Sequence, residues 1–179
     1  MAESDVEIWY EDEVHFQRHG TLTRMWAPRG KQPGVIVAPT RQNVGYFGMV
    51  CPATGESFIR LGHPFNSETV MQFFREFLES RAQAKTSTKQ IVVILDNASW
   101  HKKAVRLMTG DDSKQLVFLF LPPYSPDLNP IERLWRWTRR HCTHNKYFDH
   151  IDALADTLNK FFSLWELPNS ELRSLCATN

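Results

Sequence analysis

The sequence predicts an α/β domain in which helices flank a mixed five-stranded sheet. Residues 6–16 (VEIWYEDEVHF) alternate with the period of a strand, and residues 44–61 (VGYFGMVCPATGESFIRL) read as two strands joined by a turn. Residues 90–95 (QIVVIL) and 116–122 (LVFLFLP) are short apolar runs, typical of buried strands in a parallel sheet. Helical segments separate these runs, so we expect an antiparallel half followed by a parallel half.

Helices are expected after the hairpin and between the later strands. In residues 67–85 apolar side chains recur at the helical period, and Ser67 is the expected N-cap. The other expected helices cover residues 100–108, about 131–145 and about 149–165, and a last one begins near Asn169.

Composition is that of an ordinary globular protein. The chain has 179 residues, enough for one domain, with 42% hydrophobic and 23% charged residues. No apolar run approaches the roughly 20 residues needed to span a membrane, and the acidic N-terminus lacks a signal peptide. We therefore expect a cytoplasmic protein without membrane contact. The scattered, odd set of cysteines predicts reduced thiols: Cys51, Cys142 and Cys176.

The net charge of +1 conceals strong segregation. Residues 17–41 and residues 133–146 contain arginine and lysine but no aspartate or glutamate. Such blocks suit a protein that binds a polyanion, although a solvated surface would give the same pattern.

Two aspartates are candidate ligands for a cation. Asp12 interrupts an otherwise apolar strand face, which costs several kcal/mol unless a cation or hydrogen-bond donors meet it. Alternatively the frame is shifted by one residue, and Glu11 or Glu13 faces inward. Asp96 ends the buried strand in ILDNASWH, where α/β sheets bind ligands, or else begins a simple Asp–Asn turn. If the strand before Asp96 lies beside the first strand, the two aspartates could be neighbours.

A third carboxylate follows the rigid, proline-rich segment LPPYSPDLNPIER, residues 121–133. Asn129, Pro130 and Glu132 have the spacing of an N-cap, a first helical residue and a capping box, which alone would explain Glu132. Together, however, the three acids suit hard divalent cations, a pair of which can promote phosphodiester cleavage. Because clustered acids repel one another, we expect at least one raised pKa when no metal is bound.

These motifs carry a family resemblance over nearly the whole chain. DE (12–13), LDNASWH (95–101) and LPPYSPDLNPIERLW (121–135) resemble the catalytic domain of DDE transposases, most of all the mariner-related bacterial insertion-sequence group. The resemblance implies a ribonuclease H-like fold and a catalytic, metal-binding triad for two Mg²⁺ or Mn²⁺ ions. By this likeness the triad is Asp12, Asp96 and Glu132, supported by Asn97, His101 and Asn129.

The resemblance also implies an activity and partners. We expect a metal-dependent DNA endonuclease and strand transferase that acts on double-stranded DNA at element ends, as a homodimer on the DNA. Full-length relatives carry an N-terminal helix-turn-helix region, and this chain starts almost at the first catalytic strand. We therefore expect a single catalytic domain over 1–179, and a separate N-terminal DNA-recognition polypeptide is a candidate partner. A non-catalytic DNA-binding remnant and another ribonuclease H-like nuclease remain alternatives.

Two basic segments are candidate DNA contacts. RLWRWTRRHCTHNK (133–146) interleaves arginines, which track phosphates, with Trp135 and Trp137, which we expect mainly in the core. WAPRGKQP (26–33) reads as an exposed basic turn. The predicted DNA-binding residues are Arg133, Arg136, Arg139, Arg140, Arg29 and Lys31.

Overall fold

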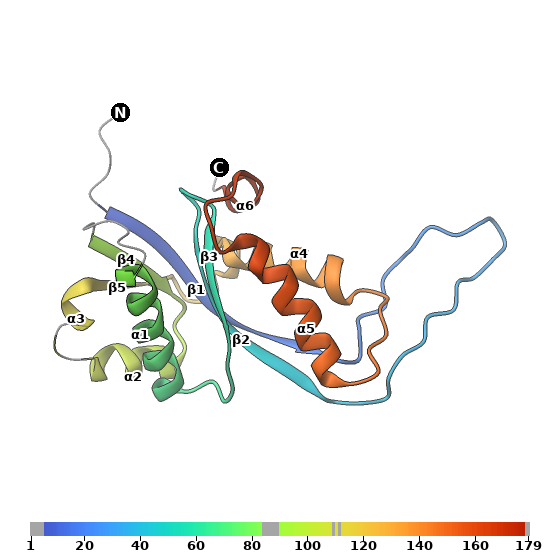
Figure 1. Ribbon diagram of the computed structural model, residues 1–179, viewed down its shortest axis with the longest axis horizontal. Coiled ribbons are helices and arrows are strands. Elements are labelled where there is room, and N and C mark those ends of the chain that lie inside the picture. The colour runs from blue at the N-terminus through green and yellow to red at the C-terminus, as the bar shows by residue number, and fades with distance from the viewer. Residues whose placement is uncertain (1–5, 84–89, 109, 111, 178–179) are drawn as a thin grey trace.

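The computed structural model describes residues 6–83, 90–108, 110 and 112–177. Its centre is a five-stranded mixed sheet with the order β3-β2-β1-β4-β5 and helices on both faces (Figure 1), which confirms the predicted architecture. The strands are β1 (Val6–Gln17), β2 (Asn43–Cys51), β3 (Glu56–Leu61), β4 (Gln90–Leu95) and β5 (Leu116–Phe120).

Strand β1 joins the antiparallel half of the sheet to the parallel half. It pairs antiparallel with β2, where Asp12 lies opposite Gly48, and parallel with β4, where Tyr10 lies opposite Ile94. Because residue 10 matches residue 94, Asp12 is level with Asp96, just beyond the end of β4. The expected neighbourhood of the two aspartates is therefore confirmed.

The expected helices form in the predicted order, with differences at their ends, and one short helix that was not predicted, Asp112–Gln115, precedes β5. The helix predicted over 131–145 ends as a π-helical turn (η2) at Thr143. Asn66 caps the first helix instead of Ser67, accepting the N–H groups of Glu68 and Thr69 at 2.9 and 3.0 Å. Residues 84 and 85 lie outside the described part of the chain. The elements are α1 (Ser67–Gln83), α2 (Ser99–Leu107), α3 (Asp112–Gln115), η1 (Pro126–Leu128), α4 (Ile131–Thr138), η2 (Arg139–Thr143), α5 (Ile151–Phe162), η3 (Ser163–Trp165) and α6 (Ser170–Cys176).

The sheet separates two hydrophobic cores. Helices α1 and α2 cover one face, where Trp9, Met49 and Phe74 are buried. Helices α4, α5 and α6 cover the other face, with Phe16 and Trp135 in its core. Since side chains alternate along a strand, β1 sends its odd-numbered residues into the first core and its even-numbered ones toward the second.

Strand β5 differs from the prediction. It was expected to be buried, but Leu119 and Phe120 are 52% and 39% exposed, and only its first residue, Leu116, is fully covered. The reason is its position: β5 is the outermost strand of the sheet and has a neighbour on one side only.

A long connection, residues 18–42, extends away from the body of the domain (Figure 1). Its tip contains a turn closed by a 3.0 Å hydrogen bond from the Lys31 N–H to the Pro28 carbonyl. Arg29 and Lys31 are exposed there, as predicted, and the indole of Trp26 is fully exposed.

Other expectations concern the cysteines and membranes. Cys51, Cys142 and Cys176 are buried free thiols, as expected. Among the described residues, no helix has the length and apolar character to cross a membrane.

Candidate active site

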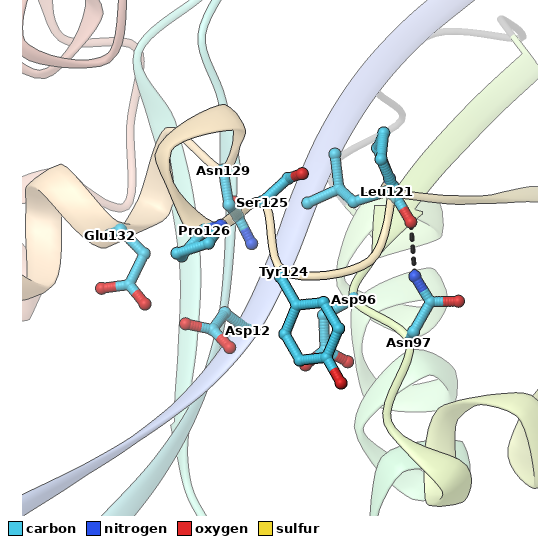
Figure 2. Close-up of a pocket in the computed structure, with 10 residues that line it drawn as sticks. Asp12, Asp96, Asn97, Leu121, Tyr124, Ser125, Pro126, Asn129 and Glu132 are labelled. Atoms are coloured by element: carbon cyan, nitrogen blue, oxygen red, sulfur yellow. Dashed lines mark hydrogen bonds between the residues drawn. The ribbon is translucent and has the colours of Figure 1, made fainter.

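The three predicted carboxylates line one cleft of about 270 Å³. Asp12 comes from β1, Asp96 follows β4 directly, and Glu132 lies in the first turn of α4. In Figure 2 the Asp12 carboxylate lies between the other two, with Glu132 on one side and Asp96 on the other. The topology thus brings together residues that are far apart in sequence.

Asp12 is the most strongly perturbed member of the triad. Its Oδ2 accepts a hydrogen bond from the indole Nε1 of Trp135 at 3.2 Å. Burial, followed by the negative charges of Glu132 and Glu13, raises its pKa to about 7. A raised pKa was expected from repulsion between the clustered acids; the direction agrees, but burial is the larger cause and repulsion adds to it.

Asp96 has the opposite environment. Its Oδ1 accepts hydrogen bonds from His101 Nδ1 at 2.6 Å and from the Ala98 N–H at 2.8 Å. The bond from His101 is the main reason why the pKa of Asp96 is lowered. The bond to Ala98 also forms the predicted turn, so the turn and the site use the same carboxylate.

The residues predicted to support the site hold its elements together. The Asn97 side chain donates to the Leu121 carbonyl and so joins the end of β4 to the start of the proline-rich loop. His101 is fully buried on α2. Asn129 Nδ2 donates to the Glu11 carbonyl at 3.0 Å, which ties the other end of the loop to β1 beside Asp12.

The capping box predicted around Glu132 does not form. The Asn129 N–H, which the glutamate would have to accept, donates instead to the Pro126 carbonyl at 2.9 Å. The Asn129 side chain does accept the Ile131 N–H, at 3.4 Å, as the expected N-cap would. The Glu132 carboxylate instead lines the cleft with the two aspartates, so the capping box does not explain this glutamate.

Tyr124 is a cleft residue that the sequence did not predict. It has a φ of 57°, which is rare for any residue except glycine, and its side chain is fully exposed. Figure 2 shows its ring in front of the cleft, between Asp12 and Asn97. Apart from the neighbouring prolines, no signal in the sequence marks it.

Glu11 and Glu13 were treated as alternatives to Asp12, yet all three occupy defined environments. Glu11 is fully buried on the opposite face of β1, where the pKa of its carboxyl is raised, chiefly by burial. Glu13 Oε1 accepts a bond from the Trp100 indole at 2.8 Å and lies 3.1 Å from His101 Nε2. Alternation along β1 could not reveal that Glu11 and Glu13 are also enclosed, because helices cover both faces of this strand.

The predicted DNA-binding residues lie in separate places. Arg133, Arg136 and Arg140 line a second cleft of about 420 Å³, together with Trp137. The Arg139 guanidinium instead lies over the Phe16 ring, 5.5 Å from its centroid. Arg29 and Lys31 lie on the extended connection 18–42. As predicted, Trp135 belongs to the core, with 1% exposure.

The triad fits divalent metal ions. All three candidate ligands are carboxylates, the donor type that Mg²⁺ and Mn²⁺ prefer. Burial and, after it, the negative charges of its neighbours raise the pKa of Asp12 to about 7, and a bound cation would offset both effects by stabilising the ionised carboxylate.

Sequence comparison connects the chain with insertion elements. Residues 7–155 match the DDE superfamily endonuclease family. The uncharacterized protein y4pE/y4sA of Sinorhizobium fredii is 34% identical over 109 residues, which are 61% of this chain and 75% of that protein. The insertion element IS630 uncharacterized 39 kDa protein of Shigella sonnei is 25% identical over 154 residues, 86% of this chain and 44% of that protein.

Comparison with solved structures bears on the fold. The Mos1 mariner paired-end complex with Mn has a TM-score of 0.69 at 17% identity, over 93% of this chain and 50% of that one. The paired-end complex with Mg gives 0.66 at 21% identity, over 95% and 52%. The predicted ribonuclease H-like fold is confirmed, and the chain spans about half of these structures. With the family match covering most of its length, the chain belongs to the DDE superfamily endonuclease family.

Proposed function

We propose that this chain is the catalytic domain of a transposase, which cuts and joins DNA phosphodiesters at element ends. The observation that carries the proposal is the shared cleft, in which Asp12, Asp96 and Glu132 converge from β1, β4 and α4. Family membership and the likeness to transposase paired-end complexes support it.

The triad would hold two Mg²⁺ or Mn²⁺ ions, which would activate the attacking water or 3′-hydroxyl and stabilise the departing oxygen. The protein's own contribution is to fix the three carboxylates before DNA arrives. Trp135 orients Asp12, His101 orients Asp96, and the loop bonded through Asn97 and Asn129 holds Glu132 at the start of α4. Catalysis by positioning of this kind needs no covalent bond between protein and DNA.

Double-stranded DNA is the proposed substrate, and two features give it binding surfaces. Arg133, Arg136 and Arg140 follow Glu132 on α4 and its π-helical extension, so phosphates beside the scissile bond can reach them. The exposed ring of Tyr124 at the cleft offers a stacking surface for a base.

A homodimer on DNA and a separate N-terminal recognition polypeptide are part of the same proposal. The extended connection 18–42 supports a protein contact, because it exposes large apolar side chains between its basic residues. These are Leu22, Met25, Trp26 and Ile36.

Nicking of supercoiled duplex DNA tests the proposal directly. The wild-type chain should nick the DNA when Mn²⁺ is present, and Asp96→Ala should not. Asp127→Ala, which removes an exposed carboxylate from the same proline-rich loop, is the matched control and should retain activity. Equal nicking by wild type and Asp96→Ala would contradict the proposal. So would the absence of nicking from a folded, DNA-binding wild-type protein, an outcome that would favour the non-catalytic remnant.

A further inference from the structure

A second group of potential metal ligands lies behind the catalytic cleft. Glu11, Glu13 and His101 each offer one ligand atom, and these atoms all lie within 4.8 Å of one another. Strand β1 alternates, so Glu11 and Glu13 point away from the face that carries Asp12. The group therefore shares the backbone of the catalytic triad but not its cleft.

The Glu11 carboxylate is left unsatisfied in this group. It is fully buried, and neither oxygen has a hydrogen-bond partner within the described part of the chain. His101 Nε2 lies 3.2 Å from Glu11 Oε2, but without the alignment of a hydrogen bond. A buried carboxylate without partners costs several kcal/mol unless a cation or a proton meets it, so this site would gain from binding a cation.

The distances from His101 Nε2 to the two carboxylates fit a shared metal ion. Atoms bound at about 2.1 Å to one ion lie about 3.0 to 3.4 Å apart at octahedral to tetrahedral angles. His101 Nε2 lies 3.1 Å from Glu13 Oε1 and 3.2 Å from Glu11 Oε2. With Glu11 bidentate, two carboxylates and one imidazole supply four donors, and their charges neutralise a divalent cation.

The surroundings also suit a metal-bound histidine. A ligating histidine usually donates its other ring N–H to a carboxylate, which fixes the ring and its tautomer. His101 Nδ1 makes such a bond to Asp96 at 2.6 Å, and the ligand oxygen of Glu13 accepts the Trp100 indole N–H at 2.8 Å. The mixture of one nitrogen and several oxygens favours Zn²⁺ over Mg²⁺.

We propose that Glu11, Glu13 and His101 form a structural Zn²⁺ site, separate from the catalytic metal site. The ion joins β1 to α2, and through the His101–Asp96 bond it fixes the position of a catalytic ligand. The proposal requires only the fold, so it stands or falls independently of nicking activity.

Calorimetric titration of the full chain with Zn²⁺, in excess Mg²⁺ to occupy oxygen-only sites, tests the proposal. Wild type should bind one Zn²⁺ tightly. Glu11→Gln should weaken that binding at least about 100-fold, since even the loss of an outer hydrogen-bond partner costs 10- to 100-fold. Asp12→Asn removes the carboxylate that lies between Glu11 and Glu13 in sequence but on the other face of β1. This variant should still bind Zn²⁺ tightly.

X-ray absorption of the wild-type Zn²⁺ complex gives a second measurement that needs no variant. The expected first shell contains nitrogen and oxygen only, with imidazole scattering and no sulfur, which excludes the three cysteines. Absence of tight Zn²⁺ binding by wild type, full binding by folded Glu11→Gln, its loss in Asp12→Asn, or a sulfur ligand would each overturn the proposal. The first of these would mean that protons alone satisfy the group.

Discussion

The indole N–H of Trp135 donates to the carboxylate of Asp12 at 3.2 Å, joining helix α4 to strand β1 within the candidate active site. Trp135 lies one turn after Glu132 on the same helix. A single hydrogen bond therefore fixes two of the three carboxylates relative to each other, and the side chain that donates it belongs to the hydrophobic core.

Replacing Trp135 by phenylalanine should reduce nicking more than it reduces stability. The change keeps an aromatic ring in the core but removes the donor to Asp12, at a cost of about 1 kcal/mol in the free energy of unfolding. Nicking rate and Mn²⁺ affinity should both fall. Trp9→Phe, which removes a buried indole N–H bonded to Glu7 at 3.3 Å in the other core, is the matched control. Equal losses of activity in both variants would refute a positioning role for Trp135.

Gly48 is expected to tolerate no side chain. It lies opposite Asp12 on β2, and a Cβ at this position would come within 2.4 Å of the Trp135 ring. Gly48→Ala should therefore lower the free energy of unfolding by about 1 to 3 kcal/mol, as overpacking in cores does, and should also impair nicking. Gly34→Ala, where nothing lies within 4 Å, should leave the melting temperature unchanged.

Metal-free stability should depend on pH through Asp12. Its carboxyl has an ordinary pKa of 3.8 and a pKa of about 7 in the folded protein, so folding favours the protonated form. This contribution to stability is complete below about pH 4 and is lost as the pH rises through 7. Denaturant melts of wild type and Asp12→Asn, compared across that range in a chelator, should show a smaller decline for the variant.

Metal affinity should change in the opposite direction, because a cation binds the ionised carboxylate. Mn²⁺ affinity of wild type should rise with pH and level off above about pH 7. An affinity that is constant between pH 5 and 7 would argue against Asp12 as a ligand.

Tyr124→Ala should weaken DNA binding without destabilising the fold. The side chain is fully exposed, so its removal exposes no core, while loss of one stacked base costs about 1 to 3 kcal/mol. An affinity loss of about tenfold, with Tyr124→Phe close to wild type, is expected in equilibrium binding by the Asp96→Ala protein. Similar DNA affinities for the Ala and Phe variants would contradict the proposed stacking of the Tyr124 ring on a base.

The second cleft, lined by Arg133, Arg136 and Arg140, should account for most of the salt dependence of DNA binding. Each lost phosphate contact lowers the slope of log affinity against log salt by about 0.9, so Arg136→Ala with Arg140→Ala should lower it by about 1.8. Lys103→Ala with Arg106→Ala removes two exposed charges from α2 and serves as the control. A slope equally reduced in both double variants would mean that the effect comes from net charge alone.

The sequence was informative wherever the decisive interaction was local or periodic. Alternation in β1 placed Asp12 on an inner face, and the apolar run of β4 placed Asp96 at a strand end. The pairing of β1 with β4 that makes them neighbours followed from ordinary crossover rules, and the structure agrees.

Where two groups could form the same hydrogen bond, the sequence did not predict which of them would form it. The spacing from Asn129 to Glu132 matches a capping box. In a capping box Glu132 would accept the Asn129 N–H, but that N–H donates to the Pro126 carbonyl instead. Ser67 and Asn66 are both good caps, and only the chain's approach to α1 selects Asn66. The burial of Glu11 depends on α2 covering the second face of β1, which no pattern within β1 records.

The order of the ligands along the chain has a consequence during synthesis. A nascent chain that has not reached residue 132 contains both aspartates but lacks Glu132, the third proposed ligand, and Trp135, which donates to Asp12, follows later still. The loop that delivers Glu132 is held by Asn129 to the carbonyl of Glu11, near the other end of the sequence. An unfinished chain therefore lacks the complete site, and the proposed nicking activity would arise late, when the last part of the site docks onto the first.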